Sequence, residues 1–141
     1  MPANRALLLA LDLLSRPGLA RAMRERPLPE DVGLLIRIVG DDETALAEAR
    51  RQTGQPAERL GRAAALYIQQ VLFTPGTDPY RVLGGTARTP PAELRRHMRL
   101  LMKWLHPDTA RNAWESVYAE RVLSAWQDLK SAPSPAHPGR T

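Results

Sequence analysis

The sequence of 141 residues has no cysteine and only one phenylalanine. Without thiols, the chain cannot form disulfides, thiolate zinc sites or cysteine nucleophiles. No stretch sustains the alternation of apolar and polar residues that predicts a strand. The apolar segment 6–14 contains Asp12 and is too short to span a bilayer. Because arginines follow it closely and no clean cleavage site is present, we expect a helix of a cytoplasmic protein rather than a signal peptide.

Acidic residues are outnumbered by basic ones, 15 to 20, which gives a formal net charge of +5. This excess favours an acidic partner, whether a protein surface, nucleic acid or an anionic membrane face. The chain contains no phosphate-binding loop, catalytic triad or metal-ligand cluster. We therefore expect a protein that is not an enzyme and that has no metal site and no cofactor.

A small group of acidic residues is better explained by helix capping than by catalysis or metal binding. The group comprises Glu30, Asp31, Asp41, Asp42 and Glu43. Pro29 suits the first position of a helix that ends at Gly40, with Glu30 and Asp31 in its first turn. Asp41 or Asp42 can cap the helix that follows.

Helical periodicity runs through most of the chain and predicts an all-α fold. The segment 74–77, Thr-Pro-Gly-Thr, is the clearest boundary in the sequence. It separates an N-terminal helical region, residues 1–76, from a second unit, residues 77–130. The tail, residues 131–141, is rich in proline, serine and glycine, and is predicted to be disordered.

Residues 94–105 of the second unit have an amphipathic helical pattern with two contrasting faces. The apolar stripe consists of Leu94, Met98, Leu101 and Leu105. His97 lies beside this stripe and is expected to be a half-buried packing residue. The opposite face is cationic and carries Arg95, Arg96, Arg99 and Lys103. Thr89 is a candidate cap for this helix.

A second amphipathic pattern, residues 112–130, follows after a short loop. Two such helices are expected to pack antiparallel, because each has an apolar stripe to bury. A short helical turn at residues 80–83 would cover one end of the pair, with Leu83 inserted. The fold class we predict is therefore an N-terminal helical region followed by an antiparallel helical hairpin with a short first helix.

Three motifs in the second unit together resemble the J domain of DnaJ-type (Hsp40) co-chaperones. The first matches the pattern of the family's short first helix, with Asp78, Pro79, Tyr80, Leu83 and Gly84. The second is the tripeptide His106, Pro107 and Asp108, which follows the basic helix directly after Leu105. The third is the segment 125–129, Ala-Trp-Gln-Asp-Leu, near the end of the last helix. The resemblance covers roughly residues 78–130 and makes the second unit J-domain-like.

The resemblance implies a co-chaperone that binds an Hsp70 of the DnaK type and stimulates its ATP hydrolysis. Arg95, Arg96, Arg99 and Lys103 would then face an acidic groove on Hsp70. The loop formed by His106, Pro107 and Asp108 would trigger hydrolysis in the partner. The N-terminal region would be the candidate for binding a client protein, for dimerisation or for targeting. No membrane partner is expected.

Several positions depart from the family's pattern and keep two alternatives open. Met98 stands at a usual tyrosine, Leu100 at a frequent basic residue, Met102 at a small residue and Ala119 at a phenylalanine. These changes are compatible with an inactive J-like scaffold that only assembles with a partner. The basic face is also compatible with a small nucleic-acid-binding protein, although no nucleic-acid motif or aromatic stacking platform accompanies it.

Overall fold

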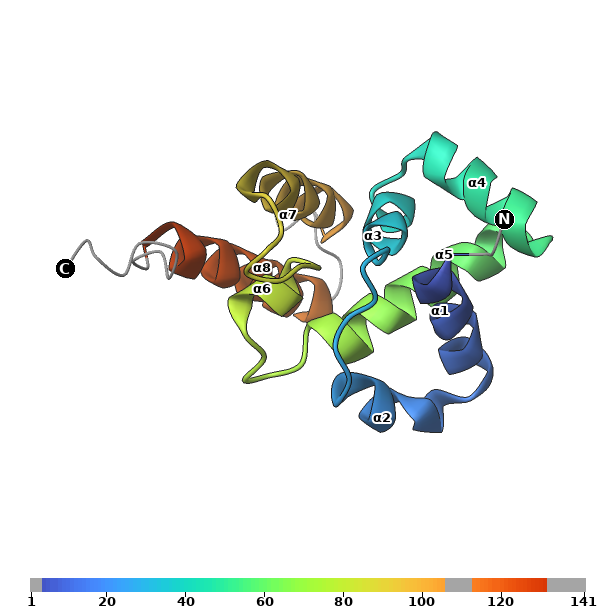
Figure 1. The fold of residues 1–141 in the computed structure, drawn as a ribbon, viewed down its shortest axis with the longest axis horizontal. Coiled ribbons are helices and arrows are strands. Elements are labelled where there is room, and N and C mark those ends of the chain that lie inside the picture. The colour runs from blue at the N-terminus through green and yellow to red at the C-terminus, as the bar shows by residue number, and fades with distance from the viewer. Residues whose placement is uncertain (1–3, 106–112, 132–141) are drawn as a thin grey trace.

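The structure, a computed structural model, describes residues 4–105 and 113–131, with the side chains of residues 113–115 excepted. Every regular element in these ranges is a helix (Figure 1), which confirms the predicted all-α fold. The N-terminal region contains five α-helices and a terminal π-helical turn. They are α1 (Arg5–Ser15), α2 (Ala20–Arg24), α3 (Gly33–Val39), α4 (Glu43–Thr53), α5 (Ala57–Tyr67) and η2 (Ile68–Leu72).

Helix α5 is the central element of this region, since α1, α3 and α4 all pack against it. The helix ends follow local sequence signals. The side chain of Asn4 accepts a hydrogen bond from the amide of Leu7, and Asp42 accepts from the first amides of α4. Gly54 ends α4 in the left-handed conformation, with a φ of 70°. The predicted cap at Asp42 is therefore confirmed.

The prediction for Pro29 and Asp31 was wrong in its details, because α3 begins only at Gly33. The carboxylate of Asp31 instead accepts hydrogen bonds from the amides of Arg5 (2.7 Å) and Ala6 (3.1 Å). Those amides lie in the first turn of α1 and have no partner within their own helix. Asp31 is thus a capping residue, as its residue type indicated, but for a helix that is distant in sequence.

The C-terminal part contains α6 (Pro79–Val82), α7 (Pro91–Leu105) and α8 (Ala113–Ser131). Helices α7 and α8 pack together and run in opposite directions (Figure 1), while the short α6 packs against α8. Leu83, at the end of α6, is fully buried. Thr89 does not act as the predicted cap of α7, because its hydroxyl accepts from the amide of Thr86 instead.

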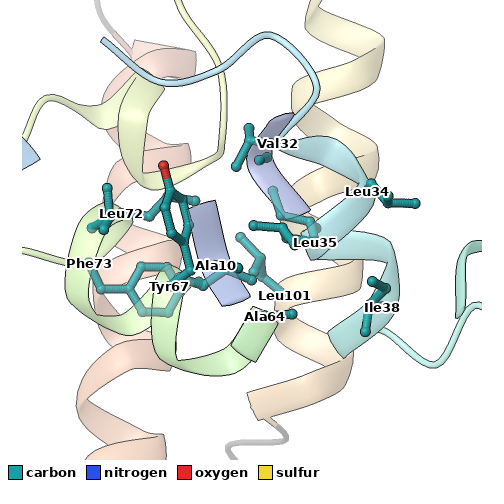
Figure 2. Packing of buried hydrophobic residues seen from close by; sticks show 14 of the residues in the cluster. Ala10, Val32, Leu34, Leu35, Ile38, Ala64, Tyr67, Leu72, Phe73 and Leu101 are labelled. Carbon is teal, nitrogen blue, oxygen red and sulfur yellow. The ribbon is translucent and has the colours of Figure 1, made fainter. Parts of the chain in front are cut away.

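One continuous apolar cluster connects the two parts of the chain. It includes Tyr67, Leu72 and Phe73 from the N-terminal region together with Leu101 of α7 (Figure 2). Helix α3 packs directly on α7, so the N-terminal region is in contact with the hairpin. Within the described ranges, no helix is long and apolar enough to cross a membrane.

Candidate partner-binding face

Helix α7 has one buried side and one exposed side. Leu94, His97, Leu101 and Leu105 are buried, and Met98 is partly buried against the same apolar cluster. The basic residues predicted to form a partner-binding face are all exposed: Arg95, Arg96, Arg99 and Lys103. They form a cationic strip along the outside of the molecule, which we call the α7 basic face.

Little of the charge of the α7 basic face is neutralised within the chain. Arg96 lies 3.9 Å from the carboxylate of Glu93, and both side chains are largely exposed to solvent. In the described ranges, Arg95, Arg99 and Lys103 form no ion pair. Exposed cations fixed to one side of a helix attract an acidic surface and also define how it docks.

The N-terminal region packs on α7 without covering the basic face. Leu100 is partly buried, and a methyl group placed on Gly40, directly after α3, would lie 2.7 Å from the Leu100 side chain. Leu100 is one of the departures from the J-domain pattern, where a basic residue is frequent. Here Leu100 packs beside Gly40, where a cation would lose part of its hydration.

His97 is more deeply buried than predicted, with 4% of its surface exposed. Its Nδ1 lies 2.9 Å from the carbonyl oxygen of Leu83, and its Nε2 faces Gly33 of α3. Burial lowers the pKa of His97, although the hydrogen bond to Leu83 and the charge of Glu93 oppose this shift. The neutral imidazole therefore joins α3, α6 and α7, and it has no role on the basic face.

Arg81 is a structural residue that the sequence did not reveal. Its guanidinium donates hydrogen bonds to the carbonyl oxygens of Met23 (3.2 Å), Arg26 (2.9 Å) and Val71 (3.1 Å). Burial lowers the pKa of Arg81, while the nearby Tyr67 and Asp78 oppose the shift. Arginine supplies several donors in a fixed geometry, which explains how one side chain can connect α6 to three distant backbone positions.

An aromatic cluster lies where α7 ends and α8 begins. Phe73 is 6.4 Å from Trp104 and 5.1 Å from Tyr118, measured between ring centroids. Arg121 donates a hydrogen bond to the carbonyl oxygen of Phe73 and lies over the Tyr118 ring. Because Phe73 belongs to the N-terminal region, that region packs against both α7 and α8 at this cluster.

The predicted trigger residues His106, Pro107 and Asp108 lie outside the described residues. The helix that leads directly to them is described through Leu105. In residues 4–105 and 113–131, no group of three or more histidine, aspartate or glutamate side chains could hold a metal ion. No family model, curated protein or solved structure matches this chain.

Proposed function

We propose that this protein is a J-domain-like co-chaperone that binds a DnaK-type Hsp70 and stimulates its ATP hydrolysis. The observation that carries this proposal is the α7 basic face, which is exposed and ends directly before the His-Pro-Asp tripeptide at residues 106–108. In this proposal the chain is not an enzyme, because the ATP that is hydrolysed belongs to the partner.

The geometry of the α7 basic face supports the proposal that the partner is an acidic protein. Arg95, Arg99 and Lys103 are held on a helix whose other side is buried, so the charges keep a fixed arrangement. Such charges raise the rate of encounter and select one docking orientation. Docking of α7 would bring the tripeptide close to Hsp70, where preferential contact with the hydrolysis-competent state would shift the partner toward that state.

The first test is single-turnover ATP hydrolysis by a DnaK-type Hsp70 in the presence of this protein. Wild type is expected to accelerate hydrolysis, and His106→Gln is expected to abolish the acceleration. Absence of stimulation by wild type with several Hsp70 proteins contradicts the proposal. Binding without stimulation would instead identify an inactive scaffold.

The second test concerns the α7 basic face and includes a charge-matched control. The double variant Arg99→Gln/Lys103→Gln is expected to weaken Hsp70 binding by about tenfold at low salt, since two docking charges are lost. The control Arg50→Gln/Arg62→Gln removes the same charge from exposed positions on α4 and α5. Equal binding by the two double variants would show that net charge, rather than the α7 basic face, determines affinity.

A nucleic-acid-binding function predicts a different dependence on salt and on His106→Gln. The affinity for nucleic acid would fall steeply with salt concentration and would be unchanged by His106→Gln. The same variant therefore separates the two functions.

A further inference from the structure

Arg37 adds a positive charge beside the α7 basic face from the N-terminal region. It lies on α3, which packs on α7 (Figure 1). A methyl group on Gly33 would lie 3.1 Å from Nε2 of His97. One on Gly40 would lie 2.7 Å from the side chain of Leu100. Positions three and four residues apart lie on one side of a helix, so Arg37 shares with Gly33 and Gly40 the side of α3 that meets α7.

The turn at residues 83–84 shows which edge of this contact Arg37 occupies. Ile36 packs against that turn, and Nδ1 of His97 is hydrogen-bonded within it. Successive residues of a helix project roughly 100° apart. Arg37 on α3 and Arg96 on α7 are the sequence neighbours of these two residues, and both therefore project from the opposite edge of the contact. Besides burial, which has the largest effect, the charges of both arginines lower the pKa of His97, so both lie near its imidazole.

The charge of Arg37 is free to meet a partner. Its side chain is partly exposed, and in the described part of the chain its guanidinium forms no ion pair and no hydrogen bond. Two carboxylates lie near this junction: Glu93, which is 3.9 Å from Arg96, and Asp41, which directly follows the contact with α7. They are outnumbered by Arg37 and the four cations of the α7 basic face, so the surface is positive. A protein can place donor groups opposite the two carboxylates, whereas a phosphate backbone is anionic throughout, so this mixed surface favours an acidic protein over nucleic acid.

We infer that Arg37 and the α7 basic face form one surface for docking an acidic protein, so that α3 takes part in binding the Hsp70 partner. Leu100, in the middle of the contact, is uncharged, and without Arg37 the cations would end at Arg96. With Arg37 they continue onto a second helix. Ile36 of α3 and Leu101 of α7 belong to the same apolar cluster, so the charges of the two helices keep a fixed arrangement and can select one orientation of the partner. The inference rests on the Hsp70 binding in the proposed function.

The test measures association of the full chain with a DnaK-type Hsp70 by surface plasmon resonance, at about 50 mM and about 300 mM salt. Arg37→Gln is expected to weaken binding by about threefold at the lower salt, mainly through slower association, and by less at the higher salt, because salt screens exposed charges. Arg37→Lys keeps the charge and is expected to bind as wild type does. Arg50→Gln removes the same charge from an exposed position on α4, and this matched control is also expected to bind as wild type does.

Arg99→Gln, on the α7 basic face itself, distinguishes failure of this inference from failure of the proposed function. Weaker binding by Arg99→Gln together with wild-type binding by Arg37→Gln overturns the inference alone. Equal losses in Arg37→Gln and Arg37→Lys also overturn it, because the charge would not be the cause. An effect of Arg37→Gln on binding to a DNA duplex but not to Hsp70 would overturn it in favour of nucleic acid. Absence of wild-type binding to several Hsp70 proteins overturns both the inference and the proposed function.

Discussion

At the residue scale, His97 and Arg81 show how single polar side chains connect distant parts of the chain. Both residues belong to the C-terminal part, and both contact the N-terminal region. Arg81 keeps its charge and satisfies three carbonyl oxygens. His97 is buried in the neutral form, so its contribution to stability depends on pH.

We predict that His97 destabilises the fold as the pH falls. Its folded-state pKa is lowered mainly by burial, whereas the hydrogen bond to Leu83 and the charge of Glu93 raise it. The charges of Arg96 and Arg37 act in the same direction as burial. Below about pH 6.5 the unfolded chain binds a proton that the folded chain does not, so the free energy of unfolding falls by up to ~1.4 kcal/mol per pH unit. This loss continues until the pH reaches the folded-state pKa.

Urea unfolding at about pH 7.5 and about pH 5.5 measures this effect. His97→Gln is expected to be less stable at the higher pH but to lose less stability on acidification. The same pH dependence in His97→Gln and wild type would contradict the prediction.

At the scale of elements, the turn after α6 determines how closely α3 approaches α7. Gly84 has a φ of 72°, and a methyl group there would overlap the side chain of Ile36 on α3. Glycine is therefore favoured by the backbone conformation, and any larger residue would also displace the Ile36 side chain. The J-domain resemblance includes Gly84, but the contact with Ile36 belongs to this chain's own N-terminal region.

We predict opposite effects from two glycine-to-alanine changes. Gly84→Ala is expected to lower the free energy of unfolding by about 2–4 kcal/mol, the sum of a strained left-handed residue and an overpacked contact. Gly61 lies within α5, and a methyl group there would meet nothing within 4 Å. Gly61→Ala is therefore expected to raise the free energy of unfolding by roughly 0.5–1 kcal/mol. Urea unfolding checks both values, and a stable Gly84→Ala variant would contradict the packing described for α3 and α7.

The sequence predicted elements better than the contacts between them. Helix positions, the Asn4 and Asp42 caps and the exposed basic side of α7 follow from local patterns, because they depend on neighbours within a few residues. The partner of Asp31 lies 25 residues away, at Ala6, and no local pattern indicates it. The same holds for the carbonyl oxygens that Arg81 binds.

The candidate site was predictable only in part, for the same reason. Exposure of Arg95, Arg99 and Lys103 follows from the helical period, because they lie opposite the apolar stripe. The burial of Leu100 against Gly40 depends on where α3 packs, and the sequence alone did not place α3.

At the scale of the whole molecule, the apolar cluster crosses the predicted boundary at residues 74–77. Phe73 packs against Trp104 and Tyr118, and α3 packs on α7. Two units that share a core are expected to unfold together, because neither buries its apolar surface alone. If they do unfold together, the division at residue 76 separates two groups of sequence motifs and does not separate independently stable domains.

The positions of the tryptophans allow a direct test of this coupling. All three, Trp104, Trp114 and Trp126, lie in the C-terminal part, so their fluorescence reports on that part and, through Trp104, on its contact with Phe73. Leu60 is fully buried in α5, and Leu60→Ala is expected to cost about 2–5 kcal/mol. If the two parts unfold together, this change lowers the urea midpoint measured by tryptophan fluorescence as much as the midpoint measured by circular dichroism. A fluorescence midpoint that stays at the wild-type value would mean that the C-terminal part is stable without the N-terminal helices, and α3 would then contribute little to holding α7.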